Sequence, residues 1–207
     1  MSAPPKTVLH ATAEEEARIR AAVRAADALQ GAGGERRLAR IEDAAALARF
    51  FSDPAVSDPI YDLPRPFTEE NVRAWIAERL ARHERGENVL SLVLGDAGEI
   101  FSYADIAVWP DRASGELAGA VRADRQNSGQ GSANMRLMFD WMFEGLGLRL
   151  ICLTAALDNI RSQKGIDAAG FTRMGGRDVT KPDGSLRQSV YWEMTRDEWR
   201  AKWKSAS

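Results

Sequence analysis

The chain has 207 residues, 44% of them apolar and 28% charged, a length and composition typical of a single globular domain. These values exclude a disordered chain and a collagen, and the presence of one cysteine, Cys152, excludes an intramolecular disulfide framework. Twenty-eight Lys and Arg against thirty Asp and Glu leave a formal net charge of −2. The chain therefore lacks the basic excess that is typical of proteins that bind a phosphate backbone, and we expect no nucleic acid partner.

The first third of the chain predicts mainly helices. Residues 13–30 begin with three glutamates and carry apolar residues at helical spacing before a glycine-rich stretch, which predicts one helix. Residues 38–41 alternate and predict a first strand, followed by a helix over 43–51 with Asp43 suited to cap it. A loop with several prolines occupies 52–67, and Thr68 can cap the next helix, which ends near Gly86.

The rest of the chain predicts a sheet with crossover helices. Short apolar or alternating runs, separated by Gly, Asp and Pro turns, favour a three-stranded antiparallel meander. Parallel neighbours need a crossover helix, so the unit from 116 to 154 should be strand, helix, parallel strand. The predicted strands are 89–94, 100–109, 116–122, 149–154, 171–174 and 188–194, and the predicted helices are 132–146 and 159–168. The fold class is therefore α+β (mixed α/β), with a mixed, mostly antiparallel sheet and helices on both faces.

A glycine-containing loop stands where the 132–146 helix begins. It reads Gln126-Asn-Ser-Gly129-Gln-Gly131-Ser132-Ala133. The first turn of a helix leaves amide hydrogens unpaired and carries partial positive charge, and glycines let phosphate oxygens approach the backbone. The loop therefore indicates a diphosphate site, although a tight strand-to-helix turn without a ligand would use the same residues.

Two motifs carry a family resemblance. Gln126-x-x-Gly129-x-Gly131 resembles the Q/R-x-x-G-x-G/A signature of the GNAT superfamily of N-acetyltransferases. Asn159-Ile-Arg-Ser162, followed by Ala169-Gly170-Phe171, resembles a second block of that family in the correct order. The ending Val190-Tyr-Trp-Glu-Met194 is similar to the branch of ribosomal-protein N-terminal acetyltransferases. The resemblance covers roughly residues 36–203, so we expect a helical extension over 1–34 and a GNAT-like domain over 35–207.

The resemblance implies acetyl-CoA as co-substrate and no metal. In the family, the pantetheine amides pair with the fourth strand, here the strand that contains Gly119, Ala120 and Val121, and the pyrophosphate binds at the glycine loop. The cofactor-binding residues that it implies are Gly119, Ala120, Val121, Gln126, Gly129, Gln130, Gly131, Ser132, Ala133, Asn159 and Ser162.

Candidate catalytic residues lie next to this cleft. Glu116, at the start of the fourth strand, is the first candidate for the general base, and Tyr103 and Asp105 on the preceding strand are alternatives. Many relatives carry a tyrosine acid seven residues after the block's asparagine, but here that position is Ile166. Ser162 is therefore our candidate acid, with water as the alternative.

The predicted function is transfer of an acetyl group from acetyl-CoA to a primary amine by direct attack. A protein N-terminus and a small amine both stay open as acceptors, and Tyr61 and Asp62 in the 52–67 loop are candidate acceptor-binding residues. The alternative is a non-catalytic acetyl-CoA sensor or scaffold, which Ile166 and the added helix suggest. No stretch approaches the length of a membrane span, so we expect no membrane partner and a cytoplasmic location. The added helix leaves a homodimer open.

Overall fold

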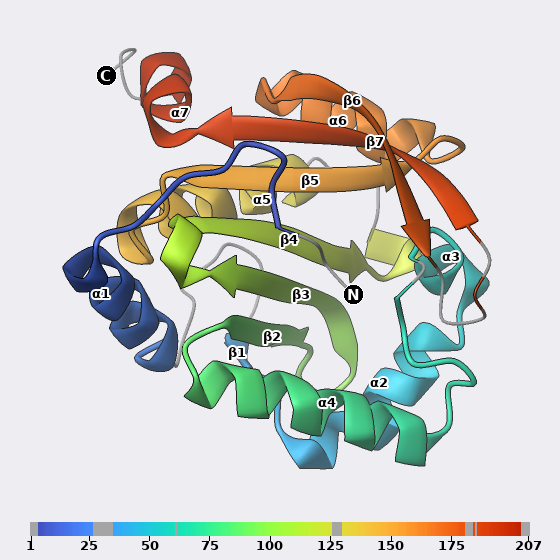
Figure 1. Cartoon of the computed structure of the whole chain (residues 1–207). Coiled ribbons are helices and arrows are strands. Elements are labelled where there is room, and N and C mark those ends of the chain that lie inside the picture. The colour runs from blue at the N-terminus through green and yellow to red at the C-terminus, as the bar shows by residue number, and fades with distance from the viewer. Residues whose placement is uncertain are drawn as a thin grey trace.

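The structure is a computed structural model, which describes residues 4–26, 35–60, 62–125, 130–180, 184 and 186–203. Within these residues, seven strands form one sheet in the order β1-β2-β3-β4-β5-β7-β6 (Figure 1). Only the β4–β5 pair is parallel in this order, which confirms the predicted mixed, mostly antiparallel sheet. The strands are β1 (Glu35–Leu38), β2 (Asn88–Leu94), β3 (Ile100–Trp109), β4 (Ser114–Val121), β5 (Leu150–Ala156), β6 (Thr172–Thr180) and β7 (Leu186–Thr195).

Helices cover both faces of the sheet. In Figure 1, α2 and α4 lie in front of the sheet, while α5 and α6 lie behind it. The front core contains Phe51, Leu92 and Tyr103, and the back core contains Phe139 and Trp192. The helices are α1 (Ala13–Arg24), α2 (Ala44–Phe51), α3 (Pro54–Ser57), α4 (Glu69–Glu84), α5 (Gln130–Asp140), α6 (Ile160–Ala169) and α7 (Arg196–Trp203). None of the helices in the described part is long and apolar enough to span a bilayer.

The predicted strand over 38–41 is wrong in position. The first strand ends at Leu38, and residues 41–43 form a short 3₁₀ helix. The Asp43 carboxylate accepts a hydrogen bond from the backbone N–H of Arg40 at 2.7 Å and pairs with Arg37, also at 2.7 Å. The sequence suggested that Asp43 caps α2. Its side chain instead reaches back to the preceding turn and does not cap that helix. The backbone N–H of Arg40 is held by a side chain and cannot extend the sheet.

Three further elements differ from the expectation. The 52–67 loop contains the single-turn helix α3, which Asp53 caps by accepting from the Ala55 N–H at 2.9 Å. The helix predicted over 132–146 is α-helical only to Asp140 and continues as a π-helix over Trp141–Gly145. Helix α7 follows β7 directly and was not predicted. Its buried Trp199 packs in the back core.

The N-terminal segment packs against the domain on two sides. Residues 4–10, which we call the N-terminal strap, cross the front of the sheet over β5 in Figure 1. Helix α1 then packs beside α4 and places Ile19 and Val23 in the back core, where their exposed fractions are 1% and 0%. The end of the expected extension, residues 27–34, lies outside the described residues.

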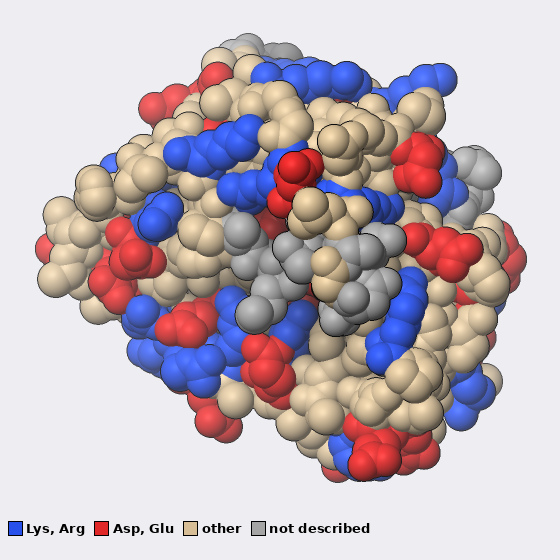
Figure 2. Space-filling view, turned by 45° about the vertical axis from the view of Figure 1, so that its right-hand side comes forward, with Lys and Arg blue, Asp and Glu red and all other residues tan. Residues whose placement is uncertain are grey.

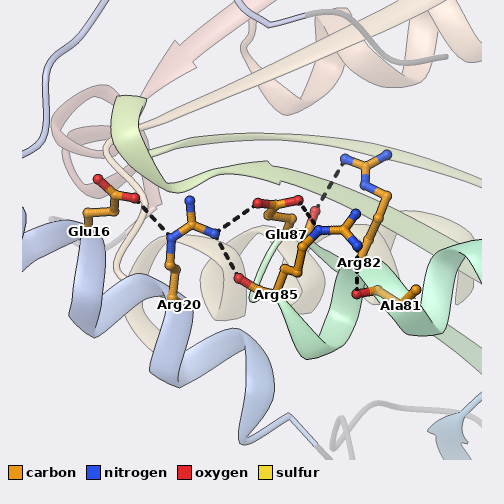
Figure 3. Close-up of polar contacts among 6 residues, drawn as sticks. All are labelled: Glu16, Arg20, Ala81, Arg82, Arg85 and Glu87. Carbon is orange, nitrogen blue, oxygen red and sulfur yellow. Dashed lines mark hydrogen bonds and ion pairs between the residues drawn. The ribbon is translucent and has the colours of Figure 1, made fainter.

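An arginine network fixes α1 to the turn after α4 (Figure 3). Arg20 donates to the Arg85 carbonyl at 2.7 Å, to Glu87 at 3.0 Å and to Glu16 at 2.9 Å. Burial alone would raise the pKa of Glu87, but the hydrogen bonds from Arg20 and Arg85 lower it below its ordinary value. The backbone of α1 passes close to Gly86. A Cβ at this position would lie 2.7 Å from the Arg20 Cα, and the φ of Gly86 is +75°.

Replacing Gly86 by alanine tests how tightly α1 is docked. In Gly86→Ala, the alanine must adopt a left-handed backbone conformation, and its Cβ clashes with α1. We therefore expect the free energy of unfolding to fall by about 3 kcal/mol. The matched control is Gly98→Ala, since Gly98 has a φ of +78° and no atom within 4 Å of a built Cβ. That variant should lose only about 1 kcal/mol in the same chemical denaturation experiment. Equal losses would contradict close docking of α1.

Candidate functional site

The site forms where β4 and β5 separate. The two strands pair in parallel at Ser114↔Leu150, Gly115↔Ile151 and Glu116↔Cys152, and at no later position among the described residues. Beyond this point residues 117–121 of β4 and 153–156 of β5 line a cavity of about 450 Å³. Strand β5 continues to pair with β7 up to Ala156, so the edge that opens is the one that faces β4.

The back wall of the cavity comes from α5 and α6. Met135, Met138 and Phe139 of α5 supply an apolar surface, and Asn159 and Ser162 supply polar atoms at the start of α6. The Asn159 Oδ1 accepts from the Ser162 N–H at 3.1 Å, so Asn159 caps this helix. Both sequence-predicted residues of this block therefore line the cavity, together with Ile166, which is 6% exposed.

The glycine loop is described only in part. Gln126 and Gly129 lie outside the described residues. Gln130, Gly131, Ser132 and Ala133 form the first turn of α5, and their side chains are likewise outside the description. The helix begins where the sequence predicts a diphosphate site, but the contacts of that site stay a prediction.

The front wall brings together two carboxylates and a phenol. Glu116, Tyr103 and Asp62 all line the cavity, as do Gly119, Ala120 and Val121 of β4. Glu116 is 5% exposed, and its Oε1 accepts from the Thr154 hydroxyl at 2.9 Å. Burial raises the pKa of Asp62, with a further contribution from Asp105. Tyr61, its predicted companion, lies outside the described residues.

Tyr103 belongs to the front core as well as to the cavity. Its ring stacks edge-on against Phe51, with centroids 5.2 Å apart, and is 3% exposed. Burial raises the pKa of its hydroxyl well above the ordinary value, and the nearby charges of Asp62 and Asp105 add to this. The phenol therefore keeps its proton near neutral pH and is suited to donate a hydrogen bond rather than to act as a base.

Asp105 is not brought to the cavity. Its two carboxylate oxygens accept from Arg79 at 2.9 Å and from Asn88 at 2.7 Å, all three residues being buried. A buried carboxylate with two such donors is held in one position. These contacts favour a structural role for Asp105, joining α4 to β2 and β3.

The sequence analysis did not single out Thr154 and Ser189, two polar residues that line the cavity together with Arg187. Arg187 donates to the Pro59 carbonyl at 2.9 Å, which ties β7 to the segment after α3 across the cavity. Alternation along β5 was the available signal for Thr154. Ile151, Leu153 and Ala155 are apolar and face the back core, so Cys152 and Thr154 must face the front.

The other features of the site concern charge and metal binding. Burial raises the pKa of the Cys152 thiol well above its ordinary value, and Glu116 adds to the effect, so the thiol stays protonated. Within the described ranges, no group of three or more His, Cys, Asp or Glu side chains is arranged to hold a metal ion. Figure 2 shows basic and acidic side chains interspersed over the face that this view brings forward.

Comparison with known proteins identifies the family. The acetyltransferase (GNAT) domain family matches residues 36–172, and the chain belongs to this family. The predicted resemblance and fold are thereby confirmed. No curated protein matches the sequence.

Solved structures agree with the fold. A protein from T. thermophilus assigned to the acetyltransferases is 24% identical, with a TM-score of 0.70 over 84% of this chain and 92% of that chain. RimJ from Mycobacterium smegmatis, in complex with CoA-disulfide, is 19% identical, with a TM-score of 0.67 over 84% and 90% of the two chains. RimL, a ribosomal L7/L12 alpha-N-protein acetyltransferase in complex with coenzyme A, is 17% identical, with a TM-score of 0.69 over 83% and 99%.

Gly165 offers a test of the cavity that spares the fold. It lies inside α6, lines the cavity, and has no atom within 4 Å of a built Cβ. Gly165→Leu should therefore fill the cavity and weaken CoA binding at least about tenfold, while the higher helix propensity of leucine keeps or raises stability by up to about 1 kcal/mol. Calorimetric titration with CoA and chemical denaturation measure the two effects.

The control is Gly165→Ala, which should raise stability by a similar amount and leave CoA affinity within about threefold. If Gly165→Leu bound CoA as tightly as the unmodified protein, the cavity would not be the cofactor site.

Proposed function

We propose that the protein is an acetyl-CoA-dependent N-acetyltransferase that acts on a primary amine with Glu116 as its general base. The observation that carries the proposal is the place of Glu116: it is the last residue of β4 paired with β5, at the point where the cavity opens. Membership of the GNAT family supports acetyl transfer. RimJ and RimL, which share the fold, were crystallised with CoA or its disulfide.

The residues present suit acetyl-CoA. The apolar wall of α5 and the opened edge of β4 provide a slot of about 450 Å³, which a larger side chain at Gly165 would narrow. When bound, acetyl-CoA supplies an acetyl group as a thioester, which an amine held nearby attacks without a metal or a covalent enzyme intermediate. In this proposal, a backbone N–H on β4 beyond Glu116, where β4 no longer pairs with β5, would polarise the thioester carbonyl.

Glu116 takes the proton that the acceptor must lose. An α-amino group with a pKa of about 8 is neutral in roughly one molecule in ten near pH 7, whereas a lysine-like amine of about 10.4 is neutral in fewer than one in a thousand. A buried carboxylate beside the amine removes the remaining proton as the bond forms. Ser162 carries a hydroxyl group on the back wall of the cavity, and we assign it as the acid that protonates the departing thiolate.

The acceptor that we favour is the α-amine of a protein chain. RimL is described as a ribosomal L7/L12 alpha-N-protein acetyltransferase, and the cavity is lined by two acidic side chains, Asp62 and Glu116, which suit a small amine. Small-molecule amines remain acceptors to be tested in the same panel. One observation favours a second function: the buried, apolar Ile166 occupies the position of the usual tyrosine acid, as expected of a non-catalytic acetyl-CoA sensor.

Glu116→Gln tests the proposed function. The amide keeps the shape and the hydrogen bond from Thr154 but cannot take a proton, so kcat should fall about 10²- to 10³-fold with CoA affinity unchanged. Release of CoA thiol with a panel of N-terminal peptides and small amines measures turnover. The control is Glu84→Gln, on the exposed side of α4, which should leave turnover unchanged.

Full turnover by Glu116→Gln would remove Glu116 as the base. Cofactor binding without turnover on any amine, also after Ile166→Tyr, would support the sensor instead.

A further inference from the structure

Three neighbouring strands carry a row of polar side chains on the front face of the sheet. Glu116 pairs with Cys152, and Cys152 pairs with Glu193 of β7. Directly paired residues point to the same side of a sheet, and neighbouring strands lie about 4.8 Å apart. Glu116 and Glu193 therefore stand at the two ends of one row, and their Cα atoms are separated by two strand spacings, or roughly 10 Å.

Each carboxylate is held by a hydroxyl from a second row, formed by the pair Thr154↔Tyr191. Thr154 donates to the Glu116 Oε1 at 2.9 Å, and Tyr191 donates to the Glu193 Oε1 at 2.5 Å. Glu116 and Glu193 are both 5% exposed. Two buried carboxylates thus share one polar layer.

The N-terminal strap covers the Glu193 end of this layer. The backbone N–H of Thr7 donates to the Glu193 Oε1 at 3.0 Å, and the Thr7 hydroxyl donates to the other carboxylate oxygen. The backbone N–H of Lys6 donates to the Tyr191 hydroxyl at 3.0 Å. Burial alone would raise the pKa of Glu193, but the hydrogen bonds from Thr7 and Tyr191 lower it below the ordinary value. Glu193 is therefore a fixed negative charge, held by neutral donors.

We propose that Thr154 and the strap-bound Glu193 are positioning residues that set the proton affinity of Glu116 from opposite sides. The inference rests on the proposed role of Glu116 as the base. The Thr154 hydrogen bond favours the ionised form of Glu116, and the like charge of Glu193 disfavours it. The strap belongs to the catalytic apparatus because it keeps Glu193 charged and closes the layer to water.

Other titratable groups near the row are held by contacts of their own or stay neutral. Asp105 of β3 is paired with Arg79 of α4, and burial raises the pKa of Cys152, of Tyr191 and of Tyr103, so these three stay neutral near pH 7. The Lys6 ammonium donates to the Met174 and Gly176 carbonyls, and Arg177 of β6 donates to the Pro4 carbonyl. Asp62 faces the cavity from the segment before α4, and burial raises its pKa.

The experiment measures the pKa of Glu116 directly, by carbon-13 NMR titration of its carboxyl in the full-length protein, with Glu116→Gln to assign the signal. Thr154→Val removes the hydroxyl at constant shape, so the pKa of Glu116 should rise by about one unit. Glu193→Gln removes the charge and keeps the acceptor oxygen, so the pKa of Glu116 should fall by about one unit. The acid limb of the pH profile of kcat, measured at saturating amine, should move in the same direction as the pKa in each variant.

Two conservative variants and one control complete the design. Thr154→Ser keeps the hydroxyl and Glu193→Asp keeps the charge, so each should stay within a few tenths of a unit of the unmodified protein. Glu84→Gln, on the exposed side of α4, should not move the titration. If the two substitutions acted only by loosening the layer and admitting water, both would shift the pKa of Glu116 in the same direction.

Shifts in one common direction, or no shift in either variant, would overturn the inference. This failure is distinct from failure of the proposed function. If Glu116→Gln keeps full turnover while the two pKa shifts are opposite, the polar layer is as described but Glu116 is not the base.

Discussion

The parting of β4 and β5 after Glu116 and Cys152 is the constraint on which the rest of the site depends. Strands that paired along their whole length would leave no slot in the middle of the sheet. Because they part, β4 turns one edge of its backbone toward the cavity, α5 and α6 form a wall behind it, and Glu116 becomes the last side chain held by both strands. In the proposed function, this side chain takes the proton of the attacking amine.

The front face of the sheet is covered in two different ways. Over β2 and β3, helices α2 and α4 bury an apolar surface that includes Leu92 and Tyr103. Over β5 and β7, the N-terminal strap takes their place and covers a polar layer instead. Helix α1 anchors this strap through Ile19 and Val23 in the back core and through the Arg20 network. The segment at the N-terminus thus contacts the back core and, through Glu193, the row that contains Glu116.

Periodicity and turn residues predicted most of the fold. The meander, the parallel β4–β5 pair and helix α6 follow from local patterns and from the rule that parallel strands need a crossover. The strand at 38–41 failed because Asp43 binds the backbone of Arg40, a contact that alternation does not show. Helix α7 was missed because only its packing of Trp199 into the back core reveals its apolar side.

The candidate site was predictable where a family motif or an alternating strand marked it. Glu116, Asn159 and Ser162 line the cavity as expected. The choice between Glu116 and Asp105 could not be made from the sequence, because it depends on Arg79 and Asn88, which are distant in the chain and pair with Asp105 in the fold. The strap contacts of Glu193 span 186 positions of the sequence and carry no local signal.

A crystal structure of the protein with CoA tests the central claim most directly. The account predicts that the pantetheine chain lies between β4 and β5 and that the sulfur lies within about 5 Å of the Glu116 carboxylate, directly or through one water. Coenzyme A bound on another surface, or with its sulfur on the far side of α6 from Glu116, would contradict it.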